Sequence, residues 1–396
     1  MKQYVTKIVL ILSLVSFFAD IASEMLYPIL PGFLASIGFT ALGIGVLEAV
    51  AKLVSGLGKT YFGALSDQLD RRVPFIRLGY LLSAIAKPLM GLFPQMAPVF
   101  AARLLDRVGK GTRGAPRDAL LVAESMPENR GKVFGFHRGM DTLGAVIGPL
   151  LVLSFIAERE LTEHYEALFL LAFVPAIIGV GLTFLLPVPP KTARNSRPRK
   201  PQPLKGIFAF WREASPEYQR ILAGVLLFAL INSTDMLLLL RAAEIGFSPY
   251  EVIFAYVLYN LVYAALSLPF GKWGDRFGFK VVFLISVLLF SGCYLALGSV
   301  ENTEAMWGIF VVYGAFTAAN DGSVKSWLSL HIPTSQRATG LGLYGFLEVL
   351  GLALASAAAG AIWKGSSGKA LFLGVGVAGF VIFFLLLFIF PAQPKS

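Results

Sequence analysis

Apolar residues fill this chain in long runs, and short polar stretches separate one run from the next. A helix needs roughly 20 consecutive apolar residues to cross the hydrocarbon core of a bilayer, so each run is a candidate membrane helix. The pattern predicts twelve helices, at residues 7–36, 42–65, 74–93, 97–124, 132–157, 166–187, 219–241, 250–270, 279–298, 304–330, 338–363 and 369–391. We therefore expect an all-α membrane protein that crosses the bilayer twelve times.

Composition supports this interpretation and excludes other classes of protein. Hydrophobic residues make up 56% of the chain, and charged residues only 15%, against about 25% in an average soluble domain. The single cysteine, Cys293, lies inside an apolar run, which excludes a disulfide scaffold and a thiolate metal site. The first run continues past Asp20 to Gly38 without an A-x-A-like cleavage site, so we interpret it as a retained membrane helix. We expect no cofactor and no metal.

The positive charges predict the orientation of the helices. The formal net charge is +10, but the charge lies in connections between apolar runs, so we do not expect a nucleic-acid partner. The even-numbered connections or their edges hold most of these residues: Arg71, Arg72, Arg77, Arg130, Lys132, Lys272, Arg276, Lys280 and Arg337. Because cytoplasmic loops are enriched in Lys and Arg, we place these connections and both termini in the cytoplasm, in a multi-pass protein of the inner membrane.

An internal repeat divides the chain into two halves. Arg130–Gly135 matches Arg337–Gly342, and six residues beyond each of these glycines Asp141 matches Glu348. Glu24-Met-Leu likewise matches Asp235-Met-Leu, at nearly the same offset. Such a repeat predicts two packed six-helix bundles with the solute path between them. We expect an N-terminal bundle at 1–187, a cytoplasmic linker rich in Pro and basic residues at 188–218, and a C-terminal bundle at 219–396.

A loop signature within the repeat resembles that of the major facilitator superfamily, and the resemblance covers about residues 7–391. The family has a Gly-x-Leu-x-Asp core followed by basic residues, and this chain departs from it with Asp70 in place of a glycine and Gln68 in place of an arginine. The resemblance implies two pseudo-symmetric bundles and a cytoplasmic latch at this loop. The gate residues that it implies are Gly63, Asp67, Arg71 and Arg72, with Asp275 and Arg276 in the second copy. The alternative is that these arginines only fix topology.

Two further segments resemble family motifs. Residues 106–121, DRVGKGTRGAPRDALL, resemble the fourth-helix motif of a bacterial subgroup. Gly144 to Pro149 resembles the first half of the fifth-helix motif of antiporters, but the closing glycine pair is replaced by Leu150 to Leu153. The partial motif slightly favours export by antiport over uptake.

Charged residues inside the predicted membrane helices are the candidate functional groups. A charge at the bilayer centre costs roughly 2.5–3.5 kcal/mol on insertion scales, so such residues normally face the protein interior or a hydrated cavity. Helix 1 places Asp20, Glu24 and Tyr27 on one face, and helix 4 repeats charges every three or four residues from Arg103 to Arg117.

The candidates fall into two sets. The expected proton-coupling residues are Asp20, Glu24, Glu48 and Asp141. The expected substrate-cavity residues are Tyr27, Arg103, Lys110, Arg113, Arg138, Asn232, Asp235, Asn260, Asn320, Asp321, Lys325 and Glu348. Aromatic residues between them, Tyr27, Tyr256, Tyr259 and Phe316, are expected to contact an apolar body. Arg138 with Asp141, and Glu48 with Lys52, have the alternative of being structural ion pairs.

These features predict a monomeric secondary active transporter that is coupled to protons and carries a small organic anion or zwitterion by alternating access. Proton-symport uptake of an organic anion is the alternative within transport. A lipid-handling membrane enzyme and a membrane sensor without transport are alternatives from other classes. The short loops hold no nucleophile, metal cluster or nucleotide site, so we expect no enzymatic activity.

Overall fold

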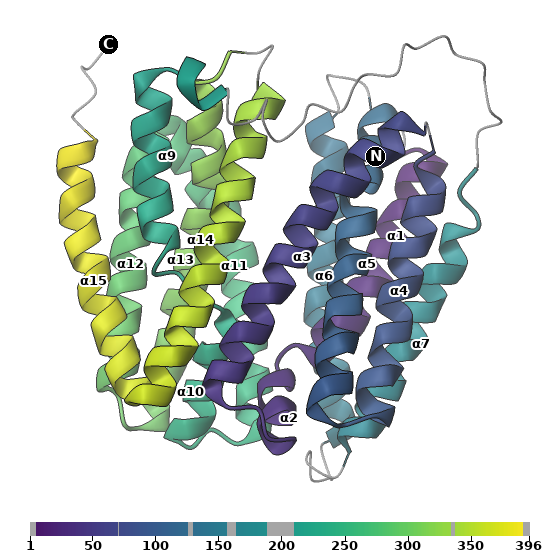
Figure 1. Ribbon diagram of the computed structural model, residues 1–396, viewed down its shortest axis with the longest axis horizontal. Helices are drawn as coiled ribbons and strands as arrows, with labels where there is room; N and C mark the ends of the chain where they lie inside the picture. The colour runs from purple at the N-terminus through teal and green to yellow at the C-terminus, as the bar shows by residue number, and fades with distance from the viewer. Residues whose placement is uncertain are drawn as a thin grey trace. The chain divides into compact units, whose positions relative to one another are not determined.

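The computed structural model describes residues 5–69, 71–125, 130–156, 164–187, 210–333 and 337–390, and these residues form fourteen helices (Figure 1). The chain divides into two compact units. The first contains residues 1–39 and 50–201, and the second contains residues 40–49 and 202–396. Most of the predicted linker, residues 188–209, lies outside the described residues.

The first unit is a bundle in which five long helices pack in the order α6, α1, α7, α4 and α5. Its helices are α1 (Lys7–Leu26), α2 (Leu30–Ser36), α3 (Ala41–Gln68), α4 (Val73–Leu92), α5 (Met96–Ala123), α6 (Arg130–Ile156) and α7 (Tyr165–Thr183). α1 packs against α6 and α7, while α4 packs against α5 and α7. α3 belongs to the first unit only from Val50 onward.

The second unit repeats this arrangement of long helices. It contains α9 (Pro216–Ala229), α10 (Asp235–Ile245), α11 (Pro249–Phe277), α12 (Phe279–Ser299), α13 (Thr303–Leu330), α14 (Arg337–Gly365) and α15 (Gly368–Ile389). α12 packs against α13 and α15, and α11 packs against α13. Ser248 and Glu251 form a reciprocal capping box at the start of α11, which satisfies backbone N–H groups that a helix start leaves unpaired.

The all-helical membrane fold expected from the hydrophobic pattern is confirmed. Among the described residues, nine helices are long and apolar enough to cross a membrane: α1, α3, α4, α6, α7, α11, α12, α14 and α15. α15 also exposes Val377, Val381, Phe384 and Phe388 at helical spacing. A row of large exposed apolar side chains is the surface that lipid covers in a membrane protein.

Two of the predicted helices are each broken into two. The first predicted span is interrupted between α1 and α2, where Pro28 lies in the break and Pro31 lies in the first turn of α2. A proline ring clashes with the carbonyl four residues earlier, so the α-helix cannot continue through this segment unchanged. The seventh predicted span is interrupted between α9 and α10, and the Thr234 side chain caps the new start by accepting a hydrogen bond from the Met236 N–H.

Candidate functional site

A polar pocket lies inside the first unit. Its volume is about 90 Å³, and on this measure one water needs about 10–15 Å³, so the pocket admits several waters. Helices α1, α2, α4, α5 and α7 all contribute to its wall. The lining residues are Asp20, Ser23, Glu24, Leu26, Tyr27, Leu30, Lys87, Met90, Arg103, Asp106, Arg107, Lys110, Arg113 and Phe169.

The wall formed by α4 and α5 depends on a close approach of the two helices. A Cβ atom added at Gly79 would lie 2.6 Å from the Gly109 carbonyl oxygen, and one added at Gly109 would lie 2.5 Å from the Gly79 carbonyl oxygen. Only residues without a side chain allow backbones to come this close. Gly111, two residues further on, faces α3 instead, and a Cβ there would lie 3.1 Å from the Gly58 Cα. The two glycines therefore seat α5 between α4 and α3.

Asp106 is the centre of a buried charge cluster in this wall. Its Oδ1 lies 3.8 Å from Lys87 Nζ, and its Oδ2 lies 3.8 Å from Arg103 NH1 and 3.5 Å from Arg107 Nε. The side chains of Lys87, Arg103 and Asp106 are only 4–10% exposed. One carboxylate thus serves three cations, and all three distances exceed the 2.7–2.9 Å that is typical of a charge-assisted hydrogen bond.

Arg113 is fixed against α4 one to two turns further along α5. Its NH1 donates hydrogen bonds to Ser83 Oγ at 2.6 Å and to the Gly79 carbonyl at 3.4 Å. Its guanidinium carbon also lies 4.3 Å from the centre of the Tyr80 ring, a geometry in which the ring's negative face attracts a cation. Lys110, by contrast, is exposed and forms no ion pair with a described residue.

The part of the pocket wall that α1 forms carries the carboxylates Asp20 and Glu24, both half-buried. α6 holds this part of α1 in place through Gly144 and Gly148. A Cβ at Gly144 would lie 2.6 Å from the Phe17 carbonyl oxygen and 3.1 Å from the Asp20 Cβ. A Cβ at Gly148 would lie 2.6 Å from the carbonyl oxygen of the residue after Asp20. The glycines of the antiporter-like motif therefore set the position of the two carboxylates.

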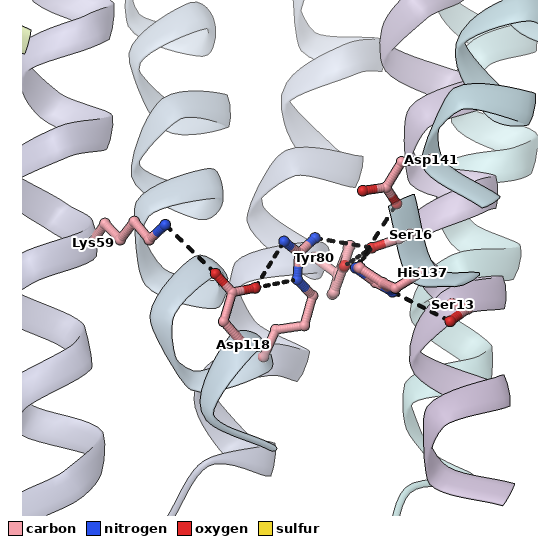
Figure 2. Close-up of polar contacts among 8 residues, drawn as sticks. Ser13, Ser16, Lys59, Tyr80, Asp118, His137 and Asp141 are labelled. Carbon is pink, nitrogen blue, oxygen red and sulfur yellow. Dashed lines mark hydrogen bonds and ion pairs between the residues drawn. The ribbon is translucent and has the colours of Figure 1, made fainter. Parts of the chain in front are cut away.

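A second polar network joins α1, α4, α5 and α6 in the same unit (Figure 2). Arg117 NH1 donates a hydrogen bond to Ser16 Oγ at 3.0 Å, and its NH2 lies 2.9 Å from Asp118 Oδ1. Ser16 Oγ also lies 3.0 Å from the Tyr80 hydroxyl, and Asp118 pairs with the exposed Lys59 of α3 at 3.5 Å. Arg117 is therefore not among the cations that line the pocket, and it connects α5 to α1.

On α6, the network contains His137 and Asp141 (Figure 2). The His137 ring is buried, with Nδ1 3.3 Å from Ser13 Oγ and Nε2 3.4 Å from Ser16 Oγ. Asp141 Oδ1 lies 3.8 Å from His137 Nε2 and has no hydrogen-bond partner among the described residues. Asp141 does not line the pocket. Arg138 is exposed, and Glu48 is buried in the part of α3 that groups with the second unit.

The predicted cavity residues of the second unit form separate contacts. Asp235 accepts a hydrogen bond of 2.5 Å from the Tyr313 hydroxyl, and Asp321 accepts one of 2.7 Å from the Tyr263 hydroxyl. Four of the other five have these positions: Asn260 donates to the Tyr256 carbonyl, Glu348 accepts from the Tyr344 hydroxyl, Lys325 is exposed, and Asn320 Oδ1 is buried without a hydrogen-bond partner in the described part of the chain. Asn232 is half-buried between α9 and α10.

Three aromatic residues that we expect to contact a solute are packed in the core of this unit. Tyr256, Tyr259 and Phe316 are only 3–8% exposed. Their rings contact one another in series through Tyr313, in tilted pairs with centroids 5.4–5.6 Å apart. Only Tyr27 of the predicted aromatic set lines the pocket.

A family model of the major facilitator superfamily matches residues 12–242 and again residues 220–396. The chain belongs to the major facilitator superfamily. It is therefore a secondary transporter, and not an enzyme. It is 34% identical over 395 residues to an uncharacterised transporter of this superfamily from Methanocaldococcus jannaschii, covering 97% of this chain and 95% of that one.

Two other similarities extend over most of this transporter. It is 25% identical over 364 residues to the multidrug resistance protein MdtH of Salmonella typhi, covering 89% of this chain and 87% of that one. A crystal structure of a mutant of the nucleoside transporter NupG matches with a TM-score of 0.81 at 15% identity, covering 97% of this chain and all of that one. At that identity, the likeness to NupG shows the fold alone.

The loop signature of this facilitator contacts its own unit. Gly63 faces α5, because a Cβ there would lie 2.8 Å from the Ala115 Cβ. Arg72 NH1 donates a hydrogen bond of 3.0 Å to the Ala119 carbonyl near the end of α5, whereas Arg71 is exposed. The side chains of Asp67 and Asp275 lie outside the described residues, and Arg276 is exposed in α11. The cytoplasmic latch stays a prediction.

Sequence reasoning missed part of the pocket of this transporter. Lys87 and Arg107 line it, and neither was a candidate. Lys87 is a lone lysine inside an apolar span, and a charged residue in such a span is itself a signal of a functional site. It lacks a charged neighbour at helical spacing in α4, so only the packing of α4 against α5 reveals its partner Asp106.

Proposed function

We propose that this facilitator is a proton-coupled transporter of a small organic anion or zwitterion, with the pocket of the first unit binding the anionic group. The observation that carries the proposal is the charge of the pocket wall. Five cationic residues line the pocket against three carboxylates, Asp20, Glu24 and Asp106. With all of these groups ionised, the wall keeps two positive charges in excess, which favours an anionic solute.

Proton coupling is assigned to Asp20 and Glu24. Both line a pocket that admits water, and both face cations across it, so each has a route for protons and a reason to compete with an anion. When a carboxylate is protonated it loses its charge, and the cations that faced it can bind the anionic solute. When it is deprotonated again, it competes with the solute for these cations. The order of these two steps would couple the proton gradient to solute movement.

Export by proton antiport is the direction that we favour. Gly144 and Gly148 set α6 against Asp20 and Glu24, so the antiporter-like motif acts on the proposed coupling residues. MdtH, to which the chain is 25% identical, bears the name of a multidrug resistance protein. Proton-symport uptake is the second candidate, because the closing glycine pair of the motif is absent from the sequence. We further propose an inner-membrane location with both termini in the cytoplasm, as the Lys and Arg distribution favours.

The test is anion flux in sealed proteoliposomes under an imposed pH gradient. Phenyl phosphate and benzenesulfonate are suitable probes because both stay ionised near neutral pH and cross lipid poorly. We expect the gradient to drive accumulation of at least one probe in vesicles that contain the wild-type protein. Glu24→Gln and Asp20→Asn should remove the dependence on the gradient while exchange of probe for probe persists.

The matched control is Glu166→Gln, the same class of change at an exposed carboxylate in the first turn of α7. It should leave gradient-driven flux at the wild-type level. Flux of both probes that ignores the pH gradient in the wild type would overturn proton coupling. Flux that responds to the gradient equally in wild type, Asp20→Asn and Glu24→Gln would overturn the assignment of these two residues.

A further inference from the structure

The cations of the pocket are not all used by the protein itself. Arg113 is committed to Ser83, Gly79 and the Tyr80 ring. Lys87 donates a hydrogen bond of 3.2 Å to the Ser83 carbonyl and also faces Asp106. These two side chains hold α4 and α5 together. They add positive charge to the pocket, but their N–H groups are mostly engaged in contacts within the protein.

Arg107 and Lys110 keep unused hydrogen-bonding capacity. The Arg107 Nε is buried and has no hydrogen-bond partner among the described residues, since Asp106 Oδ2 is 3.5 Å away and is shared with Arg103. A guanidinium carries five N–H donors, and a buried donor without an acceptor costs free energy. The Lys110 ammonium, with three donors, is exposed one turn of α5 beyond Arg107 and lines the same pocket.

Spacing and charge together define what would complete the site. Residues 103, 106, 107 and 110 recur at three or four positions along α5, so their side chains share one face of that helix. The wall has two positive charges in excess, as counted above. A monoanion would leave one of these charges uncompensated, whereas a group with two negative charges and several acceptor oxygens would neutralise both and reach more than one donor.

We infer that the pocket binds a dianionic oxyanion group, of the phosphate-monoester or sulfate type, through Arg107 and Lys110. This inference rests on the proposed function, because it names the class of the anion that the pocket takes. The dianion can be a free inorganic ion or the acidic end of an organic molecule. Asp106 holds Arg103 and Arg107 beside the bound group, and the α1 carboxylates line the same pocket.

The first arm of the test measures binding of inorganic sulfate to the purified full-length transporter, with nitrate as the monoanionic comparison at equal ionic strength. Sulfate stays dianionic throughout the pH range in which proteins are handled. Equal ionic strength makes the screening of charges the same in the sulfate and nitrate samples. We expect sulfate to bind at least tenfold more tightly than nitrate. Lys110→Gln should weaken sulfate binding at least tenfold and reduce the preference over nitrate, and Arg107→Gln should do the same.

The matched control is Lys369→Gln, which removes one positive charge from an exposed lysine of the second unit. It should leave sulfate affinity within twofold of the wild type. Melting of each variant without added anion shows whether it is folded, and Lys110→Gln is the safer variant because its side chain is exposed. Equal affinity for sulfate and nitrate, or unchanged sulfate affinity in folded Lys110→Gln, would overturn the inference.

The second arm distinguishes the two sources of the dianion. Phenyl phosphate that binds at least tenfold more tightly than sulfate indicates that the group is carried by an organic body, and similar affinities indicate a free inorganic ion; each outcome supports a dianion site. Failure of the proposed function is seen separately. pH-driven flux of benzenesulfonate with no preference for sulfate overturns this inference alone, while tight sulfate binding without any pH-driven flux overturns proton coupling alone.

Discussion

Replacing Asp106 by asparagine removes a carboxylate that three cations share inside the first unit. At 3.5–3.8 Å, each pair has a Coulomb attraction of about 4–5 kcal/mol at an effective dielectric constant of about 20. Repulsion among the cations and the cost of removing Asp106 from water offset much of this attraction. Breaking a buried ion pair by removing one partner costs about 3–5 kcal/mol, because the other charge is left uncompensated.

The expected assay is thermal unfolding of the purified protein, followed by circular dichroism at the helix band. A loss of 1 kcal/mol lowers the Tm of a domain of 150–250 residues by roughly 2–4 °C, so Asp106→Asn should melt roughly 10 °C below the wild type. Adding Lys87→Met to Asp106→Asn should recover part of this loss, since one of the uncompensated buried cations is then gone.

The matched control is Asp118→Asn, the same chemical change in a more exposed carboxylate of the same helix. Its side chain is 34% exposed, and it pairs with Lys59, which is 57% exposed, and with Arg117, which is 22% exposed and keeps its hydrogen bond to Ser16 in the variant. No fully buried charge is left without a partner, so the loss should stay at about 1 kcal/mol. Melting of Asp106→Asn within 2–3 °C of Asp118→Asn, on the same roughly 2–4 °C per kcal/mol scale, would refute the claim that Asp106 organises the cluster. A double variant that melts lower still would refute the account of Lys87 as one of its buried charges.

Three further predictions concern packing and surface charge. Gly109→Ala should lower the Tm by several degrees, because its Cβ would lie 2.5 Å from a backbone oxygen of α4, and overpacking of this kind costs about 1–3 kcal/mol; an unchanged Tm would contradict the close approach. Cys293 is 2% exposed, so a thiol-reactive fluorophore should label it only on unfolding. Gly376→Val, which crowds α12, should lower the temperature at which labelling begins. Prompt labelling of the native wild type would contradict this burial. Lys369→Ala should return the pKa of Glu301 from its lowered value toward the ordinary range, because the Lys369 ammonium donates a hydrogen bond to that exposed carboxylate. The Tm should not change. A Tm loss on the scale of Gly109→Ala would show that this pair is more than a surface contact.

The helices and one wall of the site follow from the sequence for a simple physical reason. Apolar run length marks membrane helices directly, and the row Arg103, Asp106, Lys110 and Arg113 repeats at helical spacing, so its members had to share a face. All four indeed line one pocket. Pattern within a single helix is thus enough to group residues that the same helix carries.

Contacts between helices could not be predicted in the same way. Lys87 joins the pocket only because Gly79 and Gly109 let α4 approach α5, and no periodicity in α4 marks it. Arg117 keeps the spacing of the α5 row, yet it binds Ser16 and Asp118 instead of lining the pocket. Its position depends on where α1 lies, which the spacing within α5 does not contain.

The breaks in the first and seventh spans have a different origin. Apolar run length treats residues 7–36 as one helix, although Pro28 and Pro31 oppose an unbroken backbone there. In the seventh span, a threonine followed by an aspartate is a helix-start signal, and α10 does begin at Asp235. Local capping and proline signals therefore carried information that the hydrophobic average concealed.

Anion protection of a cysteine placed in the pocket tests most directly whether this pocket is the solute site. Ser23 lines the pocket on α1 and is half-buried, so the variant is Ser23→Cys in a Cys293→Ser background. A charged, water-soluble thiol reagent should label it, and millimolar sulfate or phenyl phosphate should slow labelling at least severalfold relative to nitrate at equal ionic strength. Labelling that no anion slows, or a cysteine that the reagent never reaches in the folded protein, would contradict a hydrated anion pocket in the first unit.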